Sequence, residues 1–389
     1  RSQLEIKRQR GDFIGSFAVF GYKKDPGDHH KLVIDEFAAD VVRDIFNWKL
    51  DGISAIDIAT RLTTSGISTP MDYKLSQGMR YTTAFRIKER SEWSAGMVLR
   101  ILKNPVYTGV LEQGRVTTPS YRVKRLVQKP RDQWAVVEDC HEPIIDTFDF
   151  ETAQRVLAMD TRTAEAGQPV DLFSGMVYCG ECGGPMIRKT VPSGNKKYVY
   201  YVCAAHKNQK SCYAHSLRTE ALSDIVLKSL GQHIREVIDL AELLKLADAA
   251  RLQQAKAAKL RTRIERKQQE IDRCQTLLRS LFESLSDGII DREDYLEWKK
   301  TYQRQRDEAE GQIGLLQKEM NMELRPHDWM EHFSRQGSIT ALDRRLVVSL
   351  IERVLIFRDR RVEIVYRWQD EFILQTELVE QALSERRAG

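Results

Sequence analysis

Apolar positions recur at helical spacing three times in the first third of the chain. The first predicted helix, from Glu36 to Lys49, repeats Phe37, Val41, Ile45 and Trp48. The second follows Ser54, an N-cap residue with Asp57 at the third helical position. The third begins at Ser94 and ends near Asn104, because the residue before a proline disfavours helix. Three short helices predict either a helix-turn-helix-like domain or an interaction bundle.

Apolar residues in the last third alternate in three- and four-residue steps, which is the pattern of a coiled-coil seam. The outgoing seam comprises Ala257, Leu260, Ile264, Lys267, Ile271, Cys274, Leu278, Leu281 and Leu285. After a turn at Ser286-Asp287-Gly288, the returning seam comprises Tyr295, Trp298, Tyr302, Ala309, Leu316 and Met320. The pattern predicts an antiparallel hairpin that projects roughly 45–60 Å at ~1.5 Å per residue. Its tip is predicted to bind another hairpin through Leu285, Ile289, Ile290 and Tyr295.

Shorter patterns around the hairpin predict strands and helices of a globular domain. Val136-Val137 and Ile144-Ile145 predict short strands, followed by a helix from Asp149 to Met159 and another from Glu220 to Leu230. Beyond Pro326, we expect a helix from Arg344 to Val354 and paired strands at 354–357 and 362–366. This tail is expected to pack back on the preceding domain, which makes the hairpin an insertion.

Four cysteines have the spacing of a metal site. Cys179 and Cys182 form a C-x-x-C knuckle, and Cys203 and Cys212 follow a predicted strand at Tyr198–Val202. Two sulfur pairs on short strands favour a closed, structural zinc site over two disulfides or free thiols. His206 and His215 are weaker ligand candidates, and Cys140 is expected to be a buried thiol.

Positive charge concentrates in the first third of the chain. Residues 1–132 hold 23 Lys/Arg against 15 Asp/Glu, a net +8, whereas residues 133–242 hold 11 against 15, a net −4. The helix at Ser94 offers Ser94, Met97, Arg100 and Lys103 on its exposed face. Positive charge surrounding this helix favours DNA as the partner, with the helix in the major groove.

Other basic residues are candidates for phosphate contacts, which position a protein on DNA without reading sequence. They lie ahead of the first helix, in the insertion from Met71 to Glu92, and in a weakly periodic segment at 114–133. The candidates are Lys23, Lys24, Lys31, Arg86, Lys88, Arg122, Lys124 and Arg125. Residues 114–133 are predicted to be an extended basic linker, which can follow the DNA backbone or enter a minor groove. The alternative is an ordinary solvated loop.

Composition limits the remaining classes. Charged residues make up 30% of the chain, and neither a membrane-spanning run nor a signal peptide is visible. Six cysteines, four of them metal-spaced, indicate a reducing cytoplasm. The chain opens at Arg1 without a methionine, and we expect it to be part of a longer protein.

Several of these segments together resemble the large serine recombinases. The resemblance rests on short stretches in a fixed order, which are Gly11–Gly15, Phe20–Tyr22, Ile58–Leu62, Gly66–Pro70, Trp93–Ser94, Ile101–Gly109, His141–Asp146, the cysteine knuckle and Ser286–Ile290. It covers essentially all 389 residues. In that family a Tyr-x-Arg-x-Ser motif supplies the nucleophilic serine; none occurs here, and Tyr121-Arg122-Val123-Lys124 does not fit it.

The resemblance implies an α+β multidomain chain that lacks the catalytic serine domain of its parent enzyme. Its expected parts are a helix-turn-helix-like recombinase domain at 1–113, the linker at 114–133, a zinc β-ribbon domain at 134–245 and 324–389, and an inserted coiled coil at 246–323. It further implies structural Zn²⁺, sequence-specific binding of a double-stranded attachment half-site, and self-association through the coiled coil into a dimer on a full site and a tetramer in synapsis. The protein, bacterial or phage-encoded, is expected in the cytoplasm, on the nucleoid.

Two other classes stay open at this point: a freestanding DNA-binding regulator, and a zinc-ribbon and coiled-coil tethering protein. The regulator would be expected to begin with methionine, and the tethering protein would not need the basic first third. The sequence does not determine the target site, or whether the parent is a phage integrase or a transposon recombinase.

Overall fold

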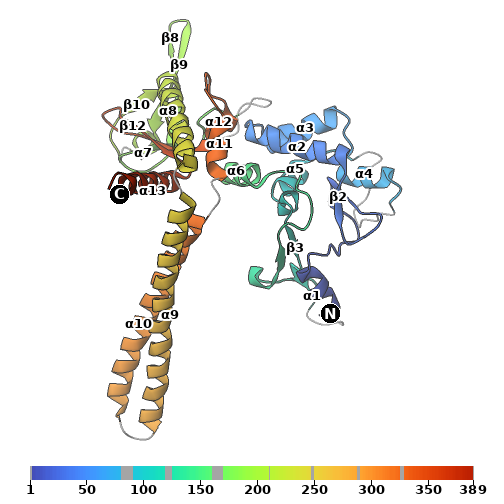
Figure 1. Cartoon of the computed structure of the whole chain (residues 1–389). Coiled ribbons are helices and arrows are strands. Elements are labelled where there is room, and N and C mark those ends of the chain that lie inside the picture. The colour runs from blue at the N-terminus through green and yellow to red at the C-terminus, as the bar shows by residue number, and fades with distance from the viewer. Residues whose placement is uncertain are drawn as a thin grey trace. The chain divides into compact units, whose positions relative to one another are not determined.

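A computed structural model describes residues 2–79, 91–118, 125–159, 170–209, 211–246, 249–286, 290–324 and 328–388. It divides into two compact units (Figure 1). Unit 1 comprises Arg1–Ser223 and Ala341–Val365, and unit 2 comprises Asp224–Thr340 and Tyr366–Gly389. Helices and sheets are both present, so the predicted α+β class is confirmed. Among the described residues, no helix is both long enough and apolar enough to span a membrane.

Three helices form the core of unit 1: α2 (Glu36–Leu50), α3 (Ala55–Thr64) and α5 (Ala95–Leu102). All three predicted helices are confirmed, and Ser54 and Ser94 act as N-caps that accept hydrogen bonds from the backbone of Asp57 and Met97. Phe37, one of the apolar residues at helical spacing in the first helix, is 51% exposed. It stacks on Tyr73 of α4 (Pro70–Ser76), a helix that occupies the start of the expected insertion.

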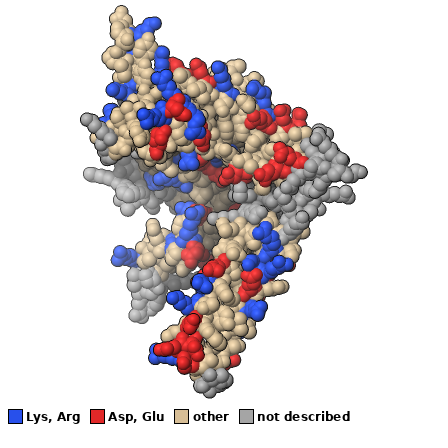
Figure 2. All heavy atoms as spheres, turned by 90° about the vertical axis from the view of Figure 1, so that its left-hand side faces the viewer, with Lys and Arg blue, Asp and Glu red and all other residues tan. Residues whose placement is uncertain are grey.

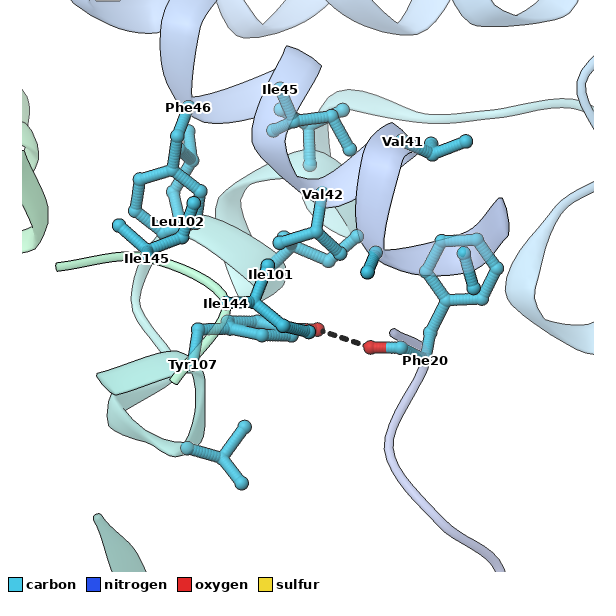
Figure 3. Packing of buried hydrophobic residues seen from close by; sticks show 14 of the residues in the cluster. Phe20, Val41, Val42, Ile45, Phe46, Ile101, Leu102, Tyr107, Ile144 and Ile145 are labelled. Atoms are coloured by element: carbon cyan, nitrogen blue, oxygen red, sulfur yellow. Dashed lines mark hydrogen bonds between the residues drawn. The ribbon is translucent and has the colours of Figure 1, made fainter. Parts of the chain in front are cut away.

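The core around these helices is closed by the segment that follows α5. The fully buried Tyr107, in a 3₁₀ turn at Pro105–Thr108, donates a hydrogen bond of 3.0 Å to the carbonyl of Phe20 (Figure 3). Ile144 and Ile145 pack beside it, and their backbone N–H groups donate to the Tyr107 carbonyl. They are bound to this turn rather than to a strand, so the predicted strand at 144–145 was wrong.

A two-stranded β-arm, made by the described residues 111–118 and 125–137, is found where an extended linker was predicted at 114–133. At its root, β3 (Leu111–Gln113) pairs antiparallel with β6 (Ala135–Val137). Further out, β4 (Val116–Thr117) pairs antiparallel with β5 (Val127–Gln128). Trp134 follows a 3₁₀ turn at Arg131–Gln133 and supports the arm by donating from its indole to the Lys129 carbonyl.

The second part of unit 1 contains two three-stranded sheets. One has the order β10-β9-β8, from β10 (Ser216–Arg218), β9 (Lys196–Cys203) and β8 (Met186–Ser193), with both pairings antiparallel. The other has the order β12-β11-β7, from β12 (Val362–Tyr366), β11 (Ile351–Ile356) and β7 (Val177–Cys179). Because β11 runs parallel to β7, the tail of the chain returns to the strand that carries Cys179.

A helix and a buried arginine precede β11. The helix α12 (Arg344–Leu350) ends four residues before the predicted Val354, because Ile351–Val354 already belong to β11. Arg344 is buried, and its guanidinium donates to the carbonyls of Leu172 and Ser174 just ahead of β7. Desolvation by burial lowers the pKa of Arg344 to about 10. The arginine therefore ties the tail to the start of the ribbon through backbone acceptors.

The remaining elements of unit 1 are short. They are α1 (Ser2–Gln9), β1 (Tyr22–Lys24), β2 (Leu32–Ile34), α6 (Thr147–Ala158) and α7 (Ala204–Gln209). The first two strands pair antiparallel across the predicted Asp-Pro-Gly-Asp turn. Helix α6 confirms the helix predicted at 149–159 within two residues of each end.

Unit 2 consists mainly of helices. The long pair α9 (Ala249–Ser286) and α10 (Arg292–Leu324) pack side by side as a hairpin (Figure 1). Of the predicted seam, Leu260, Ile271, Cys274, Leu281, Ala309 and Leu316 are buried. Trp298 is 48% exposed, so its place in the seam was wrong, and the buried Ile313 was missed. The 38 residues of α9 correspond to ~57 Å at about 1.5 Å per residue.

The base of unit 2 surrounds one buried histidine with aromatic rings. His233 lies on α8 (Thr219–Leu246), and it stacks on Tyr366 at a centroid distance of 4.0 Å. Edge-on contacts come from Phe333 of α11 (Asp328–Ser334) and Phe372 of α13 (Gln369–Ala388). Its Nδ1 lies 3.6 Å from a Glu236 carboxylate oxygen. Desolvation by burial lowers the pKa of His233, so the folded state favours the neutral ring.

Acidification is therefore expected to destabilise the base of unit 2. The folded-state pKa lies below the unfolded value of ~6.5, so the unfolded chain binds the proton more readily, and this stability is lost as the pH falls below ~6.5. Thermal melts monitored by circular dichroism at stepped pH values measure the loss. His233→Phe keeps a ring without the titrating group and should flatten this part of the profile. Equal pH dependence in both proteins would contradict the assignment.

Candidate metal centre and nucleic-acid interface

The four cysteines come from the ends of strands and from the turns beside them. Cys179 ends β7 and Cys203 ends β9, so backbone pairing fixes both positions. Cys182 follows in a turn where the N–H of Gly183, a residue with positive φ, donates to the Cys179 carbonyl. Cys212 follows α7. The turn also requires Gly180, because a Cβ there would lie 2.5 Å from the ring of Phe357.

The sulfur atoms converge on one point. All four Sγ atoms lie within 4.8 Å of one another, with Cys179 to Cys212 at 3.8 Å and Cys182 to Cys203 at 3.7 Å. A disulfide would need about 2.05 Å. A tetrahedral zinc with bonds of about 2.3 Å would hold its sulfurs about 3.8 Å apart. The donor set and its spacing therefore fit a four-thiolate zinc site.

The two histidines considered as ligands lie beside the four sulfurs. The Nδ1 of His206 is 2.9 Å from the Cys212 carbonyl. His215 places Nδ1 3.0 Å from the Tyr213 carbonyl and Nε2 3.4 Å from the Sγ of Cys179. A hydrogen bond from the backbone N–H of Gly184 is the main cause that lowers the pKa of Cys182, whereas desolvation by burial raises the pKa of Cys179 and of Cys212.

Helix α5 presents the predicted polar face. Ser94, Arg100 and Lys103 are exposed, while Met97 is half-buried and packs against the core. The Nε of Arg100 donates to the Gly96 carbonyl at 3.2 Å. Neither Arg100 nor Lys103 pairs with an acidic side chain among the described residues. Two free cations on the solvent face of a short helix are available to an anionic partner.

The remaining candidates for phosphate contact are scattered over unit 1. Lys23, Lys31 and Arg125 are exposed, and Lys24 is half-buried with its Nζ 5.6 Å from the ring centroid of Phe13. Lys31 lies 4.0 Å from Asp28, a weak surface pair. The other four candidates lie outside the described residues, namely Arg86, Lys88, Arg122 and Lys124.

A further basic surface went unnoticed in the sequence. The β8–β9 hairpin, from Met186 to Cys203, contains four Lys/Arg and no Asp/Glu. These are Arg188, Lys189, Lys196 and Lys197, all of them exposed, and Figure 2 shows basic side chains along this projecting hairpin. The net charge of −4 over residues 133–242 hid it. The available signal was local, because two pairs of adjacent basic residues flank one turn with no acidic residue nearby.

The tip of the helical hairpin exposes apolar side chains. Leu285, Ile290 and Tyr295 are half-buried, and Ile289 lies outside the described residues. More exposed are three residues near the tip that the sequence reading did not assign to it, Phe282 at 64%, Leu296 at 54% and Trp298 at 48%. Along the rest of the hairpin, basic and acidic side chains alternate (Figure 2).

Comparison with known domain families decides what these sites belong to. Residues 36–159 match the family described as Recombinase, and residues 172–231 match the family described as Recombinase zinc beta ribbon domain. The chain therefore contains a recombinase domain and a recombinase zinc-ribbon domain. The recombinase-domain match covers α2, α3, α5 and the β-arm, and the zinc-ribbon match covers all four cysteines.

Two curated relatives come from Bacillus subtilis (strain 168). An uncharacterized protein, YefB, is 27% identical over 291 residues, which is 72% of this chain and 91% of YefB. A protein named "Putative DNA recombinase" is 28% identical over 208 residues, 51% of this chain, and this match spans 38% of that protein's length. The match thus spans most of the first relative and less than two fifths of the second.

Two solved structures also resemble the chain. One, titled "Crystal Structure of a LSR-DNA Complex", is 20% identical with a TM-score of 0.36, covering 94% of this chain and 96% of that chain. The other, on the attP site of a Listeria innocua prophage, is 20% identical with a TM-score of 0.33, covering 60% and 86%. At these TM-scores the identification rests on the two domain matches.

Proposed function

We propose that this chain binds double-stranded DNA sequence-specifically, as the attachment-site-reading part of a large serine recombinase. One observation carries the proposal: the matched recombinase domain presents a short helix, α5, whose exposed face holds the unpaired Arg100 and Lys103. A helix of this kind on a three-helix core fits the major groove, where side chains reach base edges. A DNA-binding role would place the protein on the bacterial nucleoid.

The zinc ribbon would supply a second contact on the same half-site. Its β8–β9 hairpin carries the exposed Lys189, Lys196 and Lys197, which have no acidic partner among the described residues. A two-stranded ribbon is narrow enough to enter a major groove, and unpaired cations attract phosphates. We propose that Zn²⁺ bound by Cys179, Cys182, Cys203 and Cys212 is structural, since four thiolates leave no open position for a substrate.

The helical hairpin would control assembly rather than recognition. Its seam is buried between α9 and α10, whereas Phe282, Leu296 and Trp298 stay exposed near the tip. We propose that this tip joins protomers, as a dimer on a full site and a tetramer in synapsis. Strand cleavage would require a serine nucleophile from a separate catalytic domain, because the Tyr-x-Arg-x-Ser motif of the family is not found in these 389 residues.

Mutation of α5 tests the reading helix. Arg100→Ala is expected to weaken binding by ~1–3 kcal/mol at its preferred site and to relax preference at one or two base pairs, if the guanidinium contacts a base. Lys103→Ala should weaken binding to all DNA sequences alike if Lys103 contacts a phosphate. The measurement is selection from random-sequence DNA, which yields the site and footprint, followed by titration of each variant.

The matched control is Arg43→Ala on α2. It removes the same charge, but Arg43 already lies near two carboxylates, Asp40 at 2.7 Å and Glu36 at 3.9 Å. Its loss should leave the selected sequence unchanged. If both α5 variants bind with wild-type affinity, helix α5 does not lie in the groove. A wild-type chain that selects no sequence would instead reject DNA reading altogether.

A further inference from the structure

A groove separates the C-terminal end of α5 from the root of the β-arm. Its volume is about 590 Å³, and it is open to solvent on one side. Arg100 and Lys103 line it from α5, and Glu112 and Arg115 line it from the arm. Helix and arm belong to the same unit, so the two walls of the groove have a defined separation.

The floor of the groove is apolar. Phe13, Val106 and Leu111 are buried there, and the half-buried Leu99 adds an aliphatic edge from α5. Side-chain contacts hold the floor in place, because Gln113 donates to the Asp12 carbonyl at 2.8 Å and accepts from the N–H of Ile14 at 3.1 Å. A ligand seated here would therefore meet a fixed hydrophobic surface.

The rim of the groove is positive. Among the described lining residues, Arg100, Lys103 and Arg115 face a single carboxylate, Glu112. Glu112 accepts from Arg115 at 2.6 Å, and a second arginine, Arg131, lies 3.5 Å from Glu112 but does not line the groove. One carboxylate thus faces several cations, which leaves the rim with a surplus of positive charge.

A fixed apolar floor under a cationic rim suits a ligand that alternates apolar sugar with anionic phosphate. We propose that the groove seats one sugar–phosphate strand of the duplex that α5 enters. This inference rests on the proposed function and deepens it. Arg100 and Lys103 stand on the edge shared by the helix face and the groove, so α5 and the arm hold the same strand from two sides. The arm is then part of the clamp rather than a linker.

Two arginines that share one carboxylate provide the test. Arg115 and Arg131 both approach Glu112, but only Arg115 lines the groove, and its guanidinium also lies 5.1 Å from the ring of Trp134. Binding of a random-sequence 30-base-pair duplex is titrated against salt for wild type, Arg115→Gln and Arg131→Gln. Losing one phosphate contact should flatten the plot of log binding constant against log salt concentration by about 0.9 in slope. This corresponds to roughly an eightfold loss of affinity at 0.1 M salt when affinities are compared relative to 1 M salt. We expect this change for Arg115→Gln and little change for Arg131→Gln.

Arg115→Lys guards against a folding defect. It keeps the charge in the groove and should recover most of the salt slope. If the guanidinium had a merely structural role, Arg115→Lys and Arg115→Gln would bind the duplex equally weakly. Equal slopes for the two Gln variants would overturn the inference. A second result would also overturn the inference. If millimolar dAMP raises the melting temperature of the wild type but not of Arg115→Gln, and both bind the duplex with equal affinity, the groove is a nucleotide pocket. A wild-type chain that binds no duplex would refute the proposed function itself.

Discussion

Replacing Cys203 with serine is expected to release the metal and unfold the zinc ribbon while the three-helix core stays folded. Apparent free energies of ~10–16 kcal/mol for structural zinc in small modules are as large as the ~5–15 kcal/mol that stabilises a whole domain. The strand β8 has few buried contacts of its own to compensate, because most of it is exposed. Helices α2, α3 and α5 have their own cluster of buried residues and do not depend on the sulfurs.

Two measurements check this expectation. Elemental analysis should find one zinc per chain in the wild type and much less in Cys203→Ser. Hydrogen exchange should show protection lost across β8 and β9 but kept in α2, and a chelator should have the same effect. Cys140→Ser is the matched control, since that thiol lies outside the cluster and donates to the Val137 carbonyl, which a serine hydroxyl can also do. A wild-type protein without zinc, or full zinc in Cys203→Ser, would refute the assignment.

Deleting Leu260 to Met320 and closing the gap with a short Gly/Ser turn should leave binding to a single DNA site nearly intact. The hairpin buries its seam against itself, so its removal exposes little of the remaining fold. The first turns of α9 are retained, and α13 packs against α9. By contrast, bridging between DNA-bound protomers should be lost, because the exposed Phe282, Leu296 and Trp298 go with the hairpin.

Gel-shift titrations on single and paired sites separate the two effects. The milder variant Trp298→Ser keeps the hairpin and should weaken only the paired-site complex, since this indole is already 48% exposed. Leu315→Ser is the matched control, because Leu315 is 67% exposed but lies on α10 away from the tip. Loss of single-site binding on deletion would place the hairpin in the DNA-reading surface. Unchanged bridging would remove it from assembly.

Local chemistry explains which parts of this molecule were predictable. The N-caps at Ser54 and Ser94 depend on a side chain and a backbone group three residues apart, so sequence spacing suffices to find them. The four cysteines follow the same logic, because a metal site restricts both residue type and interval. Much of the α9 seam was found from its heptad repeat, whereas Trp298 of α10 was assigned to the seam and is 48% exposed.

Contacts between distant segments had to come from the tertiary structure. The sequence by itself determined the helices of the recombinase domain, the cysteine set and the helical hairpin, since each is a pattern within a short stretch. Only the tertiary structure decided that β3 and β4 pair with β6 and β5 as an arm, that β11 lies beside β7, and that Arg115 and Arg100 face one groove. Strand pairing leaves no fixed interval in the sequence, because it joins backbone groups at any separation.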